Sequence, residues 1–367
     1  MKVPLFRPSI SETAISSVAD VLRSGWLGLG PRTLEFETRF AGYVGANHCV
    51  GLNSCTSAIH LALHVLDLPA GSEVITTPLT FVSTNHAILY EDLKPVFADV
   101  DRASGNLDPS SIASGITERT RAIIVVHYGG YPADLDEIYE LARKHDLTVI
   151  EDCAHACGAV YRGKRVGSHG DFHAFSFHAV KNLPMGDGGA LTVRSPEHDA
   201  HLRRLRWLGI DKDTFRRTSS TSYDWDYDVP EVGFKYHMND IEAAIGLAQL
   251  SLLDGENARR AEIARRYREQ LNKARDVTLP PESPDRSSSF HLFPLLVENR
   301  DGFLAKMKDA GIGIGVHYRR NDTYPMYERA ELPEAEWFSE RVVSLPMHMC
   351  LSDESIEHVT TTIKSGW

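Results

Sequence analysis

The sequence lacks a long apolar run: no stretch approaches the roughly 20 consecutive apolar residues that a membrane-spanning helix needs. Its first residues also lack the apolar core of a secretory signal. Basic residues are in the minority, with 39 Lys and Arg against 50 Asp and Glu and a formal net charge of −11. Because contact with nucleic-acid phosphates needs a surplus of Lys and Arg, this balance argues against a general nucleic-acid binder. We therefore expect a cytoplasmic protein without a membrane or nucleic-acid partner.

Cysteine is scarce as well. The five cysteines are Cys49, Cys55, Cys153, Cys157 and Cys350. An odd number in such a chain is typical of free thiols and not of a disulfide framework. The run Cys153-Ala-His155-Ala-Cys157 does not have the spacing of a recognised zinc pair, and no second pair of matching spacing follows. We therefore expect no metal site.

The length of the chain and its alternation of elements predict the fold class. The 367 residues, 42% of them hydrophobic, can bury a sizeable core. Helices and short β-branched strands alternate through the first two-thirds, which predicts an α/β fold with a parallel sheet. We expect a large sheet domain at residues 1–250 and a smaller α+β domain at residues 251–367. The smaller domain should include strands at residues 290–297 and 313–318.

A lysine stands between two predicted strands. Phe175, Ser176, Phe177 and His178 alternate as a two-faced strand does, and Lys181 and a glycine-rich turn lead to the apolar run at residues 190–193. A lysine beside a hydroxyl and glycines suits a cofactor, but most lysines are simply solvated. This stretch alone leaves both readings open.

A candidate anion site lies earlier in the chain. The predicted strand at residues 48–53 runs into Ser54, Cys55, Thr56 and Ser57, and an apolar helix follows. Backbone N–H groups at such a junction, with the helix dipole, can bind an anion. Ordinary capping of the helix by Ser54 or Thr56 is the alternative.

Two further residues follow predicted strands directly. Phe81 comes just after the strand at residues 73–77, and Asp152 after the strand at residues 147–150. Open α/β sheets bind ligands beyond the carboxyl ends of their strands. Phe81 could stack on a planar ring there or belong to the core. Asp152 is costly to bury unpaired, so it should face a cationic partner unless it caps a helix. We expect Asp152 and Lys181 to face one crevice.

These residues match what pyridoxal 5′-phosphate (PLP) requires. Its phosphate needs N–H groups and hydroxyls, and its ring needs an apolar face. Its pyridine nitrogen needs a carboxylate that keeps it protonated as an electron sink. Its aldehyde needs a lysine amine. The sequence therefore predicts a PLP site, from several weak signals that occur together.

Longer motifs add a resemblance to a known family. They are SGWLGLGP at residues 24–31, NSCTSA at 53–58, PLTFVSTNHAI at 78–88, VIEDCAH at 149–155, FSFHAVKN at 175–182, GDGGA at 186–190 and GFKYHMNDI at 233–241. With them the chain resembles, over nearly its whole length, the DegT/DnrJ/EryC1/StrS family of sugar aminotransferases. The resemblance implies the PLP-dependent transferase fold type I, which is like that of aspartate aminotransferase.

The resemblance also implies roles for single residues. Lys181 would be the Schiff-base lysine, and Asp152 the partner of the pyridine nitrogen. Phe81 would stack on the cofactor ring, and His155 would lie beside it. The phosphate would be held by Thr56, Ser57 and Ser176.

The family forms homodimers in which both chains build each site. Lys235, where many relatives have Asn, would then reach the phosphate of the neighbouring chain. Cys55, at the phosphate nest, stands where Gly is usual. The residues implied at the substrate are Trp26, Leu27, His317, Tyr318 and Arg319. For Arg319 and its neighbour Arg320, an ordinary solvated pair is the alternative.

The reaction implied is transfer of an amino group, from L-glutamate in most relatives, to a nucleotide-linked keto-deoxysugar. A cyclitol (inosose) aminotransferase and a non-catalytic sensor or scaffold are the alternatives. Family members that act as sugar 3-dehydratases replace the lysine with His, so Lys181 argues against that activity.

Overall fold

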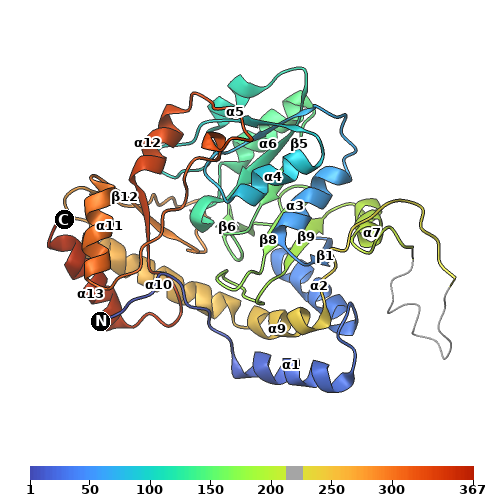
Figure 1. Ribbon diagram of the computed structural model, residues 1–367, viewed down its shortest axis with the longest axis horizontal. Helices are drawn as coiled ribbons and strands as arrows, with labels where there is room; N and C mark the ends of the chain where they lie inside the picture. Colours follow the sequence, from blue (N-terminus) through green and yellow to red (C-terminus); the bar gives the residue numbers. More distant parts are fainter. Residues whose placement is uncertain (212–225) are drawn as a thin grey trace.

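The computed structural model describes residues 1–211 and 226–367, and a seven-stranded sheet forms its centre (Figure 1). Across the sheet the strands are β1 (His48–Leu52), β9 (Gly189–Val193), β8 (Phe172–Ser176), β5 (Thr148–Asp152), β4 (Thr120–Val126), β2 (Glu73–Thr76) and β3 (Lys94–Phe97). β9 is antiparallel to both of its neighbours, and the other pairs are parallel. The predicted α/β class is confirmed, and the sheet is mostly parallel.

Helices cover both faces of this sheet. They are α1 (Glu12–Ser24), α2 (Pro31–Val44), α3 (Cys55–His64), α4 (Val82–Tyr90), α5 (Pro109–Gly115), α6 (Leu135–His145), α7 (Pro196–Leu205) and α9 (Asp240–Leu250). Neighbouring residues of β4 point to opposite sides: Ile124 packs in the core that includes α3, whereas Ile123 and Val125 pack in the core that includes α6. Burial on both faces explains why these strands are continuous apolar runs.

A second, antiparallel sheet lies in the C-terminal part. Its strands are β10 (Val277–Thr278), β12 (Phe293–Val297) and β13 (Val342–Leu345), and the helices of this part are α10 (Leu253–Leu271), α11 (Arg300–Asp309), α12 (Pro333–Arg341) and α13 (Asp353–Lys364). A small third sheet joins β11 (Arg286–Ser287), β6 (Val160–Tyr161) and β7 (Lys164–Arg165), and two 3-10 turns are η1 (Tyr128–Gly130) and η2 (Asn321–Thr323).

Two segments connect the large sheet to the C-terminal sheet. Helix α10 begins in the core of α2 and α9, where Leu253 packs, and ends in the core of the C-terminal sheet, where Tyr267 and Leu271 pack. Val3 belongs to that same C-terminal core, and Figure 1 shows the N-terminus beside α13. The C-terminal core therefore includes the first residues of the chain. A domain boundary at residue 250 stays a prediction.

The predicted strand at residues 313–318 is wrong. In that stretch Gly315 forms a single bridge with Ser344, and residues 316–318 are not in a strand. The side chains from Val316 to Arg319 line a cavity, so they cannot alternate between two faces of a sheet.

Two simpler features complete the fold. All five cysteines are free thiols, and Cys350 is the exposed one. Among the helices of the described ranges, none combines the length and the apolarity that crossing a bilayer requires.

Candidate active site

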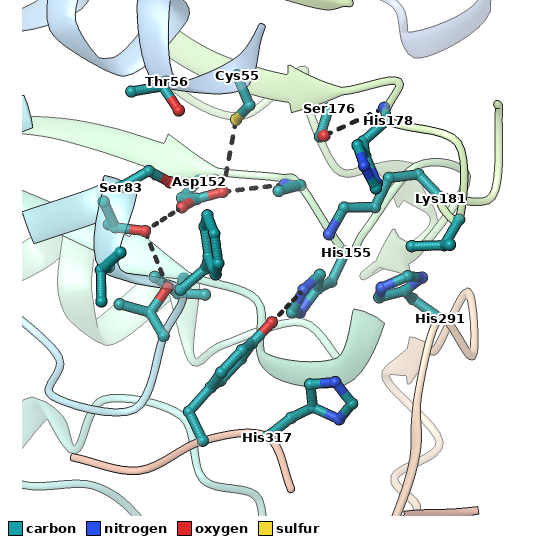
Figure 2. Close-up of a pocket in the computed structure, with 18 of the residues that line it drawn as sticks. Cys55, Thr56, Ser83, Asp152, His155, Ser176, His178, Lys181, His291 and His317 are labelled. Carbon is teal, nitrogen blue, oxygen red and sulfur yellow. Dashed lines mark hydrogen bonds between the residues drawn. The ribbon is translucent and has the colours of Figure 1, made fainter. Parts of the chain in front are cut away.

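A cavity of about 550 Å³ opens where the large sheet meets the C-terminal part of the chain. Asp152 ends β5 and Ser176 ends β8, so both reach it from carboxyl ends of strands. Lys181 lies in the loop between β8 and β9 and lines the same cavity, as expected. Figure 2 shows Asp152 beside Cys55, and Lys181 on the side of the cavity with His155 and His291.

Asp152 is held by hydrogen-bond donors. One carboxylate oxygen, Oδ2, accepts from the Thr84 hydroxyl at 2.7 Å, and the other, Oδ1, accepts from the Ala154 N–H at 3.0 Å. Because Thr84 donates its proton to Asp152, the 2.8 Å contact between Thr84 and Thr80 must have Thr80 as donor. The sulfur of Cys55 lies 3.8 Å from Oδ1. The side chain is thus fixed in the cavity wall by two hydrogen bonds, one to each carboxylate oxygen.

The pKa of the Lys181 amine is lower than that of an ordinary lysine. Burial lowers the pKa of Lys181 to about 8, although Asp152 and Cys55 act in the opposite direction. Its loop is folded tightly, since the Ala179 N–H donates to the Gly186 carbonyl at 2.9 Å and the Met185 N–H to the Phe177 carbonyl at 2.8 Å. A substantial fraction of the amine is therefore neutral and nucleophilic at mildly alkaline pH.

Three uncharged histidines stand near this amine. Burial, followed by the charge of Lys181, holds the pKa values of His155 and His291 well below their usual range, and the same two causes lower the pKa of His317 to about 4. The rings of His155 and His291 lie 4.5 Å apart, and Nε2 of His155 is 3.1 Å from the Tyr318 hydroxyl. Among the described residues, the buried Nδ1 atoms of His155 and His291 have no hydrogen-bond partner.

The first turn of α3 forms another wall. Ser54 caps the helix and accepts from the Ser57 N–H at 3.1 Å, and the Ser57 hydroxyl donates back to the Ser54 carbonyl at 2.7 Å. Ser57 is therefore bonded within the cap, whereas Cys55 and Thr56 line the cavity. A Cβ on Gly189 of β9 would lie 2.5 Å from the Cys55 nitrogen, so a glycine is needed for the strand to pass this turn.

Several predicted residues lie outside the cavity of their own chain. Lys235 is exposed, and its Nζ lies 3.4 Å from the centre of the Trp207 ring. Leu27 is exposed, and Trp26 donates from Nε1 to the Leu29 carbonyl at 3.1 Å. Lys235, Trp26 and Leu27 could act in a cavity only as parts of a neighbouring chain.

The two adjacent arginines have different surroundings. Arg320 is buried and pairs with both carboxylate oxygens of Asp322, at 3.0 Å from Nε and 2.6 Å from Nη2. Arg319 lies at the cavity wall and is exposed. Arg320 thus belongs to the fold, whereas the Arg319 guanidinium lies 5.0 Å from the centre of the Tyr324 ring and donates from Nε to the Thr323 hydroxyl at 3.0 Å.

Sequence reasoning missed some residues of the cavity. Phe81 lies beyond its strand and lines the cavity, and so does Thr84, three residues later, for which the sequence carries no signal. His291 and Phe6, whose rings stack at 5.8 Å in another wall, were also missed. A polar residue in the apolar run Phe290-His291-Leu292-Phe293 was a usable signal, whereas Phe6 offered none.

Comparison with known proteins places this geometry in a family. Residues 8–364 match the DegT/DnrJ/EryC1/StrS aminotransferase family. The chain belongs to this family. This member of the DegT/DnrJ/EryC1/StrS family is therefore an enzyme, and it is a sugar aminotransferase, as the sequence predicted.

Individual relatives are similar over almost their whole length. The spore coat polysaccharide biosynthesis protein SpsC of Bacillus subtilis is 38% identical, with 99% of this chain and 96% of SpsC covered. Among solved structures, AtS13 of Actinomadura melliaura is 41% identical with a TM-score of 0.94, and the sugar aminotransferase CalS13 of Micromonospora echinospora is 37% identical with a TM-score of 0.92. Both comparisons cover 100% of each chain.

Enzymes of this family depend on PLP, and further solved relatives are in PLP and PMP forms. The residues present fit that cofactor. The cavity offers an amine with a pKa of about 8, a carboxylate held by donors, and a helix turn that Gly189 keeps open. The predicted cofactor is confirmed.

Proposed function

We propose that the protein transfers the amino group of L-glutamate to the keto group of a nucleotide-linked deoxysugar. The product would be an amino sugar for polysaccharide or glycoside biosynthesis. The observation that carries the proposal is the meeting of Lys181 and Asp152 in one cavity of about 550 Å³. A cavity of this size can hold a cofactor together with a sugar.

Lys181 and Asp152 have complementary roles in this proposal. PLP, when bound, supplies an electron sink for the charge left at the donor carbon. Lys181, with its pKa of about 8, would hold PLP, and its Nζ would then accept a proton and return it. Asp152, held by Thr84 and Ala154, would keep a proton on the pyridine nitrogen of bound PLP.

The remaining predicted residues would position the cofactor. Thr56 and Ser176 would bind its phosphate with the first turn of α3, where the helix dipole favours an anion. Ser57 would act through the cap that it stabilises. Phe81 and His155 would flank the ring, and the uncharged state of His155 fits a position beside an amine that must lose its charge.

The neutral histidines and Arg319 bear on the substrate. His317 and Tyr318 present a polar, uncharged wall, which suits sugar hydroxyls. Arg319 is exposed at the same wall, and a guanidinium binds phosphate oxygens in pairs. We assign Arg319 to the diphosphate of the nucleotide sugar.

We also propose a homodimer with shared sites. Lys235, Trp26 and Leu27 do not line their own chain's cavity, and Val232, an apolar residue three positions before Lys235, is 87% exposed. A second copy would cover such apolar surface and bring Lys235 to the phosphate of its neighbour.

One experiment tests the substrate. The purified enzyme would be incubated with glutamate and a panel of nucleotide-linked 3-keto and 4-keto sugars, with an inosose as the unphosphorylated comparison, and products read by mass. An amino sugar from at least one nucleotide sugar supports the proposal. Amination of the inosose alone would overturn it.

A second experiment tests whether Lys181 is the residue that binds PLP covalently. Borohydride treatment of the PLP-loaded enzyme should fix the cofactor to the peptide that contains Lys181. Recovery of the label on a different peptide would contradict the assignment.

A further inference from the structure

A cluster of metal-ligand side chains lies outside the catalytic cavity. His60 and His64 are one turn apart on α3, and Glu91 follows the last residue of α4. Oε1 of Glu91 lies 2.6 Å from Nε2 of His60 and 2.9 Å from Nδ1 of His64. The three possible ligand atoms all lie within 4.8 Å of one another. The two imidazoles and the carboxylate thus converge on one point.

Two histidines and one glutamate form a known ligand set for zinc. Histidines four residues apart share one helix face, so both rings can reach one ion. Ligand distances of about 2.0–2.2 Å place tetrahedral ligand atoms roughly 3.3–3.6 Å apart. The present contacts of 2.6 and 2.9 Å are shorter, as hydrogen bonds are, so the Glu91 carboxylate has to move back by about 0.5–1 Å to admit an ion.

The Tyr236 hydroxyl supports the first histidine from outside. It lies 3.1 Å from Nδ1 of His60. When Nε2 of His60 carries the proton, Nδ1 accepts from this hydroxyl, and when Nε2 binds an ion, Nδ1 carries the proton and donates to it. Such an outer hydrogen bond fixes the orientation of a metal-binding ring.

The cluster is open to solvent on one side. The side chain of His60 is 6% exposed, but that of Glu91 is 20% and that of His64 is 32% exposed. A hollow of about 320 Å³, lined by His60, Tyr90 and Tyr236 among others, adjoins it. An ion can therefore enter and keep a position for water.

The other cluster of this kind in the described residues differs. His127, Glu151 and Cys153 are fully buried, and Glu151 accepts from Tyr139 at 2.5 Å and lies 3.0 Å from His127. Its oxygens are already used inside the fold, and no side of the cluster is open.

We propose that His60, His64 and Glu91 bind one divalent transition-metal ion, with Zn²⁺ as the best match. The ion ties α3 to the end of α4. Through Tyr236 it also steadies the segment that carries Lys235, one residue away. The prediction of no metal site rested on the spacing of Cys153 and Cys157. Glu91 lies 27 residues after His64, and only the fold brings them together.

The test uses untagged, PLP-loaded enzyme that has been dialysed against a chelator. Zn²⁺ is titrated by calorimetry, and Co²⁺ is added as a probe whose visible ligand-field bands report its ligands. We expect one ion per chain with a Kd of about 1 µM or tighter. His64→Gln and Glu91→Gln should weaken binding by at least about 10-fold. His86→Gln, on α4 and outside the cluster, should bind as the wild type does.

Equal binding by the wild type and both cluster variants would overturn the proposal, as would a wild-type Kd near about 1 mM. Retained PLP absorbance shows whether a variant has folded. If a variant does not fold, anomalous diffraction from wild-type crystals soaked in Zn²⁺ decides instead. An ion between His60, His64 and Glu91 supports the site, and ions only elsewhere refute it.

Discussion

The hydroxyl of Thr84 and the carboxylate of Asp152 lie 2.7 Å apart and connect the first turn of α4 to the end of β5. Thr80 donates to the same hydroxyl at 2.8 Å, so a short chain of hydrogen bonds ends on the carboxylate. Buried chains of this kind strengthen each bond within them. The position of Asp152 thus depends on two threonines that do not have to touch the substrate.

Thr84→Val should lower kcat by about 10–100-fold, since a lost hydrogen bond to a charged group is worth about 1.5–3 kcal/mol. The conservative variant Thr84→Ser keeps the hydroxyl and should retain most of the activity. Single-turnover rates with glutamate measure the effect. Equal rates for the Val and Ser variants would show that this bond does not support Asp152.

Asp152→Asn should keep the fold but lower the rate of the glutamate half-reaction by at least about 100-fold, or about 2.7 kcal/mol in barrier height. An amide cannot carry the negative charge that holds a proton on the nitrogen it faces. Stopped-flow absorbance measures the rate, and the visible cofactor band shows that PLP is still bound. A near-normal rate would refute the electron-sink role of Asp152.

The rate of PLP uptake by cofactor-free enzyme should rise with pH and have its midpoint at about 8, because the pKa of Lys181 is lowered to about 8 by burial. Below that pH the amine is protonated and cannot attack, and above it the amine is neutral. In Asp152→Asn the midpoint should move lower still, because Asp152 raises this pKa. A midpoint near the ordinary lysine value of about 10.4 would contradict the assignment.

Mixing Lys181→Ala with Lys235→Ala subunits should restore activity if each site takes one residue from each chain. If the subunits pair at random, half of the dimers are mixed. One of the two sites in each mixed dimer is intact, so about a quarter of wild-type activity is expected. Each variant alone serves as its control. No recovery at any mixing ratio would show that the sites are not shared.

Glu37→Gln should lower the free energy of unfolding by about 3–5 kcal/mol, because it leaves the buried Arg206 without its counter-charge. Glu37 pairs with Arg206 and, at 2.6 Å, with Arg203, and it accepts from the Gly51 N–H at 2.9 Å. Burial raises its pKa, but the two arginines outweigh burial and hold the pKa below its usual range. This stabilisation is therefore present above the ordinary glutamate pKa and is lost as the pH falls through the lowered value.

Glu35→Gln is the matched control for that change. Glu35 lies on the same helix, in a pair with Arg32 in which both side chains are nearly half exposed, and should change stability by less than about 1 kcal/mol. Thermal unfolding at neutral and mildly acidic pH compares the two variants. Equal effects would mean that the Glu37 pair adds no more than a surface pair.

The positions of some residues of this site could be predicted from the local sequence. Asp152 and Ser176 could be placed because each follows an apolar run, and the carboxyl ends of parallel strands meet at one edge. Lys181 could be placed between its strands. Thr84 could not be assigned to Asp152, because the contact joins residues 68 positions apart and depends on how α4 sits on the sheet.

The C-terminal part was harder to predict for a different reason. Residues 313–318 have the β-branched and aromatic content of a strand, but the side chains of residues 316–318 line the cavity. A single bridge at Gly315 joins this segment to the C-terminal sheet. Tertiary context overrides local preference in such a segment. Likewise, nothing in the local sequence of Val3 indicates that it packs in a core formed by residues more than 250 positions later.

The place of Val3 limits how the enzyme can be recombined with its relatives. Its N–H donates to the Gly311 carbonyl at 2.9 Å, and its carbonyl accepts from the Gly313 N–H at 2.8 Å. These two hydrogen bonds connect the start of the chain to the segment that leads into residues 316–319 of the cavity wall. A chimaera made by one crossover near residue 250 would join two halves of a core from different parents. Exchange of the substrate wall as a unit therefore needs two crossovers, one after the first residues and one within α10.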